Sequence, residues 1–255
     1  MRFASIGSGS EGNGLVVESG KTRLLIDCGF GVRDTAARLA RIGLAPESLS
    51  AIIVTHEHAD HVGGVPAFAS RHGIPVWLTF GTLGITGERF AGMDRVYGFD
   101  SHDRFVVGDL EVRPFPVPHD AREPVQFVVT DGAVRLGVVT DLGTTTRYVE
   151  MSLSGCDALV LECNHDADML AQSDYPMSLK QRIGGRFGHL CNDGAATLLR
   201  ALDTSHLQHI VAAHLSQQNN TPARACAALA GALGCTTDWI GVADQARGFD
   251  WRSLS

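Results

Sequence analysis

The sequence has no long hydrophobic run, because no stretch of about 18 consecutive apolar residues occurs in it. Its N-terminus also lacks an apolar stretch behind a basic flank, the pattern of a secretory signal peptide. We therefore predict that the chain neither spans a membrane nor carries a signal peptide. We expect a cytoplasmic protein with no membrane partner, and the sequence predicts no particular oligomeric state.

Paired cysteines and a positive net charge are also absent. None of the six cysteines belongs to a Cys-x-x-Cys pair, which argues against a zinc knuckle and against a disulfide framework. We predict reduced, mostly buried thiols at Cys28, Cys156, Cys163, Cys191, Cys226 and Cys235. The formal net charge of -7 argues against broad electrostatic wrapping of nucleic acid, although it leaves room for a local basic surface.

No internal repeat and no low-complexity linker divides the chain. A chain of 255 residues with 44% hydrophobic residues can bury a large core, so we predict one domain over residues 1–255. Strand-like and helix-like segments alternate, which predicts an α/β fold. Residues 32–42 and 66–72 indicate helices, residues 75–115 indicate short strands and turns, and residues 126–140 indicate a hairpin with an Asp-Gly turn.

The most informative stretch is His-Glu-His-Ala-Asp-His at residues 56–61, directly after a short apolar, β-branched run. Neutral imidazole and carboxylate groups are common metal ligands, so this composition at a strand end favours a metal site. His56 and His58 lie two positions apart and point the same way on extended backbone, so they can bind one ion. Asp60 and His61 come one turn later and could bind a second ion.

Two ions need more ligands than this stretch supplies. Three further candidates each follow a strand-like apolar run, namely His119, Asp141 and His214. Each of them alone is more often an ordinary polar residue at the end of a strand. Together, and beside the histidine-rich stretch, they favour a site for two metal ions.

These residues resemble the metallo-β-lactamase fold superfamily, with its HxHxDH signature followed by single His, Asp and His residues in this order. The resemblance implies a four-layer αβ/βα sandwich and two divalent ions per chain, Zn or Mn. It also implies a hydroxide activated by the two ions and oriented by Asp60, and hydrogen bonds from Asp27 that support the ligand loop. The ligands implied are His56, His58 and His119 for one ion and Asp60, His61 and His214 for the other, bridged by Asp141.

Segments of the second half resemble the YycJ/WalJ group of this superfamily, and the likeness extends over nearly the whole chain. The group is one of metal-dependent nucleases, which implies a 5′-to-3′ exonuclease acting on duplex DNA with a 5′ end. Cys191 departs from the group, because a serine is expected there. The segments are Leu161–Asp166, Tyr175–Pro176, Leu179–Gly185, Gly188–Asn192 and His214–Asn220, with residues 7–10 and 119–121.

Candidate substrate contacts gather near these motifs. Residues 175–192 contain three basic residues and no acidic one, so they could meet successive phosphates, although a solvated helix and a flexible loop would show the same composition. The small-residue loop at 8–14 could bind phosphate or be a generous hairpin turn. The predicted contacts are Ser8, Ser10, Asn13, Asn164, Lys180, Arg182, Arg186, Asn219 and Asn220.

Two loop histidines, His165 and His189, are catalytic candidates beside Asp60. Either could contact the scissile phosphate or protonate the leaving oxygen. Alternatively, either could be a supporting residue that only forms a hydrogen bond to a neighbouring side chain. Three alternatives to a DNA nuclease stay open at this point. They are another hydrolase of the superfamily (an RNA nuclease, or an enzyme acting on a lactam, thioester or lactone), a di-iron redox protein, and a nucleic-acid-binding scaffold with a degenerate site.

Overall fold

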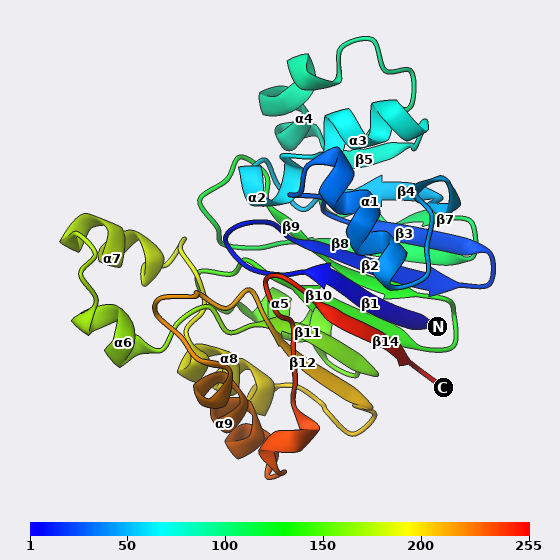
Figure 1. Ribbon diagram of the computed structural model, residues 1–255. Helices are drawn as coiled ribbons and strands as arrows, with labels where there is room; N and C mark the ends of the chain where they lie inside the picture. The colour runs from blue at the N-terminus through cyan, green and yellow to red at the C-terminus, as the bar shows by residue number, and fades with distance from the viewer.

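The computed structural model describes residues 1–255 and contains two seven-stranded sheets (Figure 1). The first sheet has the order β14-β1-β2-β3-β4-β5-β6, and the second has the order β13-β12-β11-β10-β9-β8-β7. The strands are β1 (Arg2–Gly7), β2 (Gly14–Ser19), β3 (Thr22–Ile26), β4 (Ala51–Ile53), β5 (Val76–Thr79), β6 (Val96–Phe99), β7 (Phe105–Val107), β8 (Leu110–Pro116), β9 (Val125–Thr130), β10 (Arg135–Val139), β11 (Ala158–Glu162), β12 (His209–Ala213), β13 (Gly241–Val242) and β14 (Phe249–Ser253).

Helices cover the outer face of each sheet, and none of them is long and apolar enough to cross a membrane. The α-helices are α1 (Val32–Arg41), α2 (Ala59–Val62), α3 (Val65–His72), α4 (Phe80–Thr86), α5 (Arg147–Leu153), α6 (Ala167–Gln172), α7 (Met177–Ile183), α8 (Asn192–Ala201) and α9 (Pro222–Leu233). Three short 3₁₀ turns are η1 (Pro46–Ser48), η2 (Gly87–Phe90) and η3 (Thr237–Trp239).

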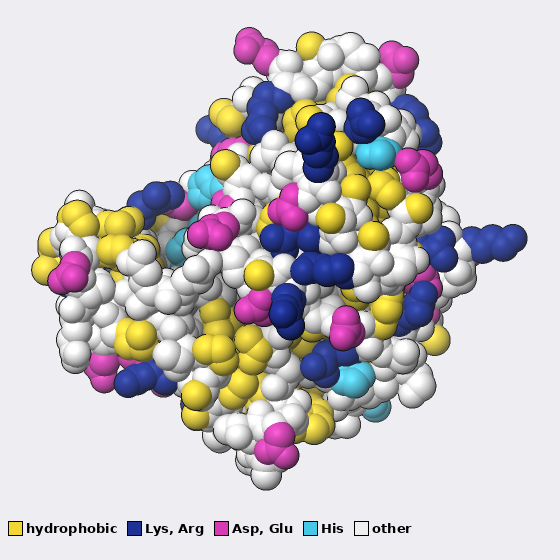
Figure 2. Space-filling view, in the orientation of Figure 1, with side chains coloured by type: hydrophobic (Ala, Val, Ile, Leu, Met, Phe, Trp, Pro, Cys, Tyr) yellow, Lys and Arg dark blue, Asp and Glu magenta, His cyan; other side chains and the backbone are white.

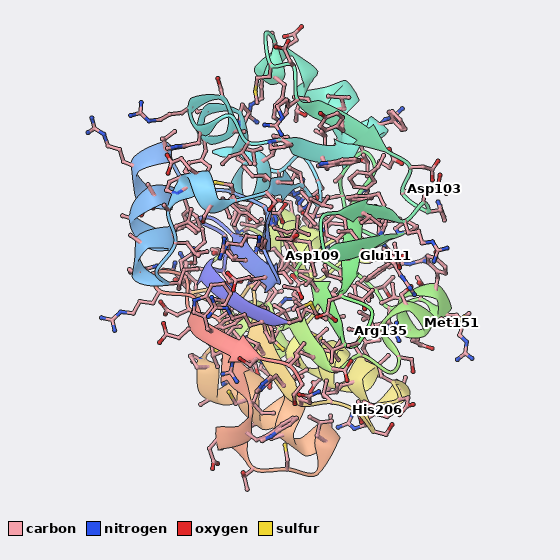
Figure 3. The ribbon with its side chains drawn as sticks, turned by 90° about the vertical axis from the view of Figure 1, so that its right-hand side faces the viewer. Asp103, Asp109, Glu111, Arg135, Met151 and His206 are labelled. Atoms are coloured by element: carbon pink, nitrogen blue, oxygen red, sulfur yellow. The ribbon has the colours of Figure 1, made fainter.

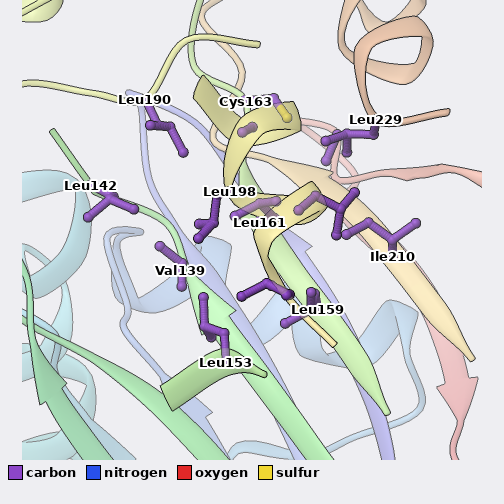
Figure 4. Packing of buried hydrophobic residues seen from close by; sticks show 14 of the residues in the cluster. Val139, Leu142, Leu153, Leu159, Leu161, Cys163, Leu190, Leu198, Ile210 and Leu229 are labelled. Atoms are coloured by element: carbon purple, nitrogen blue, oxygen red, sulfur yellow. The ribbon is translucent and has the colours of Figure 1, made fainter. Parts of the chain in front are cut away.

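Side chains alternate between two cores along the buried strands. In β3, Leu24 and Ile26 enter the core between the sheets, whereas Leu25 packs under α1 and α3. In β11, Val160 points between the sheets and Leu161 packs against α8 and α9 (Figure 4). Strands buried on both faces are apolar throughout, which is why they appear in the sequence as continuous hydrophobic runs. The predicted four-layer αβ/βα sandwich is thus confirmed.

Helix α5 belongs to the outer layer of the second sheet. Its Val149 and Leu153 join the core under that sheet, while Met151 is exposed on the side of the molecule that Figure 3 presents. Arg135, at the start of β10, donates to the carbonyl oxygens of Ser152 and Ser154 and so holds the end of this helix. The far ends of β10–β12, away from this contact, lead to the residues described below.

Strand direction gathers the polar candidates at one edge of the sandwich. Strands β3–β6 are parallel, as are β10–β13, so the carboxyl ends within each group share an edge. Two successive antiparallel pairings relate β1 to β3 and β8 to β10, so β1 and β8 run in the same direction as these groups and their carboxyl ends lie at the same edge. Ligand sites in open α/β sheets form at such edges. The segments that follow these strands carry Asp27, His56–His61, His119, Asp141 and His214.

Most predicted elements are confirmed, with one correction. The helices at 32–42 and 66–72 correspond to α1 and α3, and the Asp-Gly turn joins the antiparallel strands β9 and β10. The prediction of only strands and turns over residues 75–115 is wrong, because Phe80–Thr86 forms α4. Its glycine and threonine content disfavours a helix. The Thr79 hydroxyl caps it at Thr82 N, and the Glu123 carboxylate accepts from Gly81 N.

All six cysteines are free thiols, and four of them are buried, as predicted. The pKa of the Cys28 thiol is raised to about 11, because the effect of burial is larger than the opposing effect of the hydrogen bond with Thr35. Such a thiol is protonated at neutral pH and inert. The prediction of a single domain over residues 1–255 stays a prediction.

Candidate active site

Three histidine nitrogens converge on one point at the shared edge. His56 Nε2 lies 3.0 Å from His58 Nδ1, and His119 Nε2 lies 3.2 Å from the same atom. The His56 ring is fully buried, that of His119 is nearly so, and that of His58 is partly open to solvent. Nitrogen lone pairs that face one another at this spacing suit a shared cation, so these three residues could hold a metal ion.

A second group of donors lies beside the first. His61 Nε2 is 3.4 Å from Asp60 Oδ2, and His214 Nε2 is 3.4 Å from that same oxygen. Asp141 lies between the two groups, with Oδ2 2.9 Å from His61 Nε2 and Oδ1 3.7 Å from His119 Nε2. This places one oxygen of a single carboxylate toward each group, the arrangement expected of a bridging ligand.

The chemistry and burial of the donor atoms indicate that this set fits divalent cations. Asp141 is 1% exposed, and its Oδ2 receives no well-formed hydrogen bond from any group of the chain. A buried carboxylate oxygen without a donor is costly unless something else neutralises it. Imidazole nitrogen and carboxylate oxygen together suit Zn or Mn. The residues present therefore match the group that their chemistry implies.

The opposite ring nitrogens are held by hydrogen bonds that set the tautomer. When Nδ1–H donates to a neighbour, Nε2 keeps its lone pair for a metal. Four of the histidines follow this pattern, and His58 is reversed, with Nε2 turned toward Asp120 at 3.8 Å. The Nδ1 contacts are His56 with Thr55 Oγ1 at 2.9 Å, His61 with Asp27 Oδ2 at 2.8 Å, His119 with Gly188 O at 2.9 Å and His214 with Glu162 Oε1 at 3.2 Å.

Asp27 is the anchor of the histidine-rich loop. Its carboxylate accepts from Thr55 N, from Thr55 Oγ1 and from His61 Nδ1, each at 2.8 Å. Because the Thr55 hydroxyl donates to Asp27, it accepts from His56 Nδ1. The Asp27 carboxylate thus fixes the tautomer of both His56 and His61. Asp27 adopts a left-handed backbone conformation with φ 60°, which turns the chain sharply after β3.

Glu162 is a site residue that the sequence reasoning missed. It ends β11, it is fully buried, and it accepts from His189 Nδ1 at 2.8 Å and His214 Nδ1 at 3.2 Å. Its other oxygen accepts from Leu142 N and Leu190 N. The signal was available, because Glu162 follows a buried apolar strand as Asp141 does.

Charge is strongly concentrated in the cluster. Burial alone would lower the pKa of His61, but the carboxylates of Asp141 and Asp27 raise it well above the ordinary histidine value. The pKa of His214 is raised to about 9 against the effect of burial, chiefly by Asp141. Burial would raise the pKa of Asp141, yet His214 and His61 hold it well below its usual range. Metal ligands bind deprotonated, so a divalent cation would compete with these protons.

Most of the predicted polar substrate contacts are buried and bonded within the chain. Ser8 Oγ accepts from His214 N, and Asn13 Nδ2 lies 3.1 Å from His61 Nε2. Asn164 Nδ2 donates to His214 O. The Asn220 amide bonds with Asn192. These side chains hold the loops that carry the histidines, and their contact with a substrate stays a prediction.

Three further candidates differ from these. Ser10 is exposed. Asn219 is 1% exposed, and both polar atoms of its amide lack a hydrogen-bond partner in the chain. His165 is 3% exposed, and its Nδ1 lies 3.3 Å from the Asn164 amide oxygen. His165 therefore belongs to the second layer of loop contacts, whereas His189 lies in the donor cluster itself, 3.2 Å from Asp141 Oδ1.

The basic candidates lie on an arm formed by α6 and α7, which projects from the body of the molecule (Figure 1). Lys180 donates to Ala171 O within the arm. Arg182 Nε lies 2.7 Å from Asp120 Oδ2, and Asp120 Oδ1 lies 3.5 Å from His119 Nε2. Arg186 is exposed and enters no ion pair. Figure 2 shows histidine side chains in the hollow between this arm and the body.

Comparison with known proteins identifies the superfamily and the fold. The sequence pattern of the Beta-lactamase superfamily domain matches residues 22–214. The fold is that of the metallo-beta-lactamase fold protein YhfI from Bacillus subtilis, with a TM-score of 0.77, 16% identity and 99% of each chain covered. Zn(2+)-bound PqqB from Methylobacterium extorquens aligns with a TM-score of 0.73 and 18% identity over both whole chains.

Two sequence relatives narrow the family. The chain is 35% identical over 222 residues to "Exodeoxyribonuclease YycJ" of Bacillus anthracis, covering 86% of this chain and 84% of that protein. It is 31% identical over 225 residues to "Exodeoxyribonuclease WalJ" of Streptococcus pneumoniae serotype 2, covering 86% and 83%. The chain is therefore a metal-dependent hydrolase that belongs to the beta-lactamase superfamily and, within it, to the YycJ/WalJ family.

Proposed function

We propose that the protein is a cytoplasmic nuclease that uses two divalent ions to degrade double-stranded DNA from a 5′ end, in the 5′-to-3′ direction. The observation that carries this proposal is the pair of donor groups that share Asp141. Relatives that cover most of the chain are named exodeoxyribonucleases, which supports DNA as the substrate. The duplex preference and the direction follow from the resemblance to the YycJ/WalJ group.

The ligand sets are assigned as the two donor groups suggest. His56, His58 and His119 would hold one ion, and Asp60, His61 and His214 would hold the other, with Asp141 between them. Zn and Mn both suit these donors. When bound, such a pair lowers the pKa of water toward neutrality and neutralises charge that develops on a phosphate.

Residues of the chain then position the reactants. Asp60 uses Oδ2 for His61 and His214, which leaves Oδ1 free to accept a hydrogen bond from the attacking water and orient it. His189 donates from Nδ1 to Glu162, so its Nε2 is turned away from that carboxylate, on a ring that is 25% exposed. That nitrogen can give a proton to the departing oxygen of the phosphodiester. Glu162 keeps the ring in this orientation.

A digest of end-labelled polymers tests the proposal. Duplex DNA and duplex RNA, each labelled at the 5′ or the 3′ end, are incubated with enzyme loaded with Zn or Mn and with chelator-treated enzyme. We expect DNA, and not RNA, to release 5′ label as short products before 3′ label appears, and we expect chelation to stop the release. The Asp60→Ala variant should be more than about 100-fold slower, since removing a ligand costs at least as much as removing its hydrogen-bonding support.

Asp94→Ala is the matched control, because it removes an exposed carboxylate far along the chain from every donor of the site. It should digest DNA at the wild-type rate. Wild-type enzyme that cuts neither polymer at matched metal loading would refute the nuclease proposal. Release of 3′ label first would refute the direction, and cleavage of RNA alone would favour the ribonuclease alternative.

A further inference from the structure

The loop between α7 and α8 runs directly along the donor cluster. Its Gly188 carbonyl accepts from His119 Nδ1 at 2.9 Å, and its His189 Nδ1 lies 2.8 Å from Glu162. Phe187 is therefore one position, and Arg186 two positions, away from the Gly188 carbonyl that touches a proposed metal ligand. Consecutive Cα atoms are about 3.8 Å apart, so side chains at these positions can reach a nucleotide next to the scissile bond.

The backbone of this loop is held in place. Gly188 N donates to Gly185 O at 2.9 Å, and His189 N donates to Ile183 O at 2.8 Å. Gly143, two residues after Asp141, packs so closely that a Cβ there would collide with the Arg186 carbonyl oxygen and the Phe187 Cα. The loop and the Asp141 segment are thus fitted to each other without an intervening side chain.

Two side chains on this fixed backbone are exposed and enter no aromatic or ion pair within the chain. The Phe187 side chain is 59% exposed and makes no aromatic or cation–π pair. Arg186 is exposed without an ion pair, whereas Lys180 and Arg182 are bonded to Ala171 O and Asp120. Exposing a large apolar ring to water is unfavourable, so leaving this ring uncovered gives up stability. An aromatic ring and a guanidinium on successive residues have the chemistry to bind a nucleobase and a phosphate.

We propose, building on the nuclease function above, that Phe187 stacks on the nucleobase beside the scissile phosphate while Arg186 binds the neighbouring phosphate. Every nucleobase has a π face, so stacking needs no particular sequence, as suits an enzyme that degrades a strand progressively. Guanidinium groups pair with phosphate oxygens in a fork. Phe187 is then a positioning residue, which aligns the phosphodiester over the donor cluster without touching the reacting atoms.

The test combines variants of Phe187 with abasic substrates. Each duplex carries one abasic nucleotide at the first, second or third position from the 5′ end. Stacking is worth about 1–3 kcal/mol per base, which corresponds to about 5- to 150-fold. We expect Phe187→Ala to raise KM on intact duplex by a factor in this range, and Phe187→Trp to restore it. At one of the three positions, an abasic nucleotide should raise the KM of the wild type by the same factor. The same abasic nucleotide should not raise the KM of Phe187→Ala any further.

Two controls separate stacking from other causes. Trp239→Ala removes a similarly exposed aromatic ring from η3, next to α9, and should leave KM unchanged. A single-stranded oligomer of tetrahydrofuran abasic nucleotides offers phosphodiesters without any aromatic ring, so wild type and Phe187→Ala should hydrolyse it equally, which also shows that the variant is folded. Equal losses for both enzymes on every abasic duplex, or an unchanged KM for Phe187→Ala, would overturn the stacking proposal. Failure of the wild type on every phosphodiester would instead overturn the nuclease function.

Discussion

Replacing Glu162 by Gln is the sharpest perturbation that the site offers. The change keeps the size of a fully buried side chain but exchanges one acceptor oxygen for an NH₂ donor. Oε1 of Glu162 accepts from His189 Nδ1 and His214 Nδ1, and Oε2 accepts from Leu142 N and Leu190 N. The amide of the variant can satisfy only one of these two pairs of donors.

The orientation of the amide follows from the size of the penalties. Backbone N–H groups cannot change, so an NH₂ facing Leu142 N and Leu190 N would strand two buried donors at about 1–3 kcal/mol each. Imidazole can move its proton, so the NH₂ should face the histidines instead. His214 would then accept at Nδ1 and carry its proton on Nε2, the atom facing Asp60. Losing such orienting support lowers metal affinity about 10- to 100-fold, or about 1.4–2.7 kcal/mol.

Competition with a chromogenic chelator measures the two metal affinities. We expect Glu162→Gln to weaken the ion held by Asp60, His61 and His214 by this factor and to leave the other ion nearly unchanged. Glu18→Gln is the matched control, since Glu18 is a largely buried carboxylate that pairs only with Arg2 and Arg23. If Glu162→Gln binds both ions with affinities within about threefold of the wild-type values, the tautomer reasoning is refuted.

Three other predictions follow from single contacts. Asp27→Asn should weaken the ion at His61 about 10- to 100-fold in the same titration, because the amide cannot accept as both carboxylate oxygens do. Arg182→Gln removes an exposed ion pair with Asp120, so stability should change by less than about 1 kcal/mol, whereas Arg186→Gln, at a residue without an ion pair, should lower the logarithmic salt dependence of KM on duplex DNA by about one. Burial would raise the pKa of Asp131, but hydrogen bonds from Val134 and Ala133 lower it to about 2. This stabilisation is present above the unfolded value of 3.8 and is lost as pH falls through 2, so urea unfolding should show Asp131→Asn about 1 kcal/mol less stable at pH 7 and equal to wild type only below pH 2.

The convergence of the candidate metal ligands was predictable because the sandwich has a simple rule. Side chains that follow strands of the same direction meet at one edge, and His119, Asp141 and His214 each follow a strand-like run. Their order along the chain, together with the histidine-rich loop, then leaves few other residues that could complete a site for two metal ions. No exact strand boundary was needed, because a shift of one or two residues keeps these positions beyond the strand end.

The supporting contacts were not predictable in the same way. Asp120 and Arg182 lie far apart in the sequence and meet only because the α6–α7 arm projects beside the loop after β8. Helix α4 was missed because its propensity is poor and its caps come from tertiary neighbours. The sequence predicts Asn13 and Asn220 as substrate contacts, but their hydrogen bonds within the chain could not be predicted, because a buried amide and a ligand-binding amide have the same letter in a sequence. Only burial and bonding distinguish them.

The site also concentrates the backbone strain of the fold. Asp27 and His214 are the two non-glycine residues with positive φ, at 60° and 54°, and each carries a side chain of the cluster. A left-handed non-glycine residue costs about 1–3 kcal/mol and persists only where its surroundings hold it. Asp27 N donates to Ile53 O, and His214 is held by Ser8 Oγ at its N–H and by Asn164 at its carbonyl. The sharp turns that aim these side chains thus depend on buried polar residues, which explains why Ser8 and Asn164 belong to the functional motif even if neither touches a substrate.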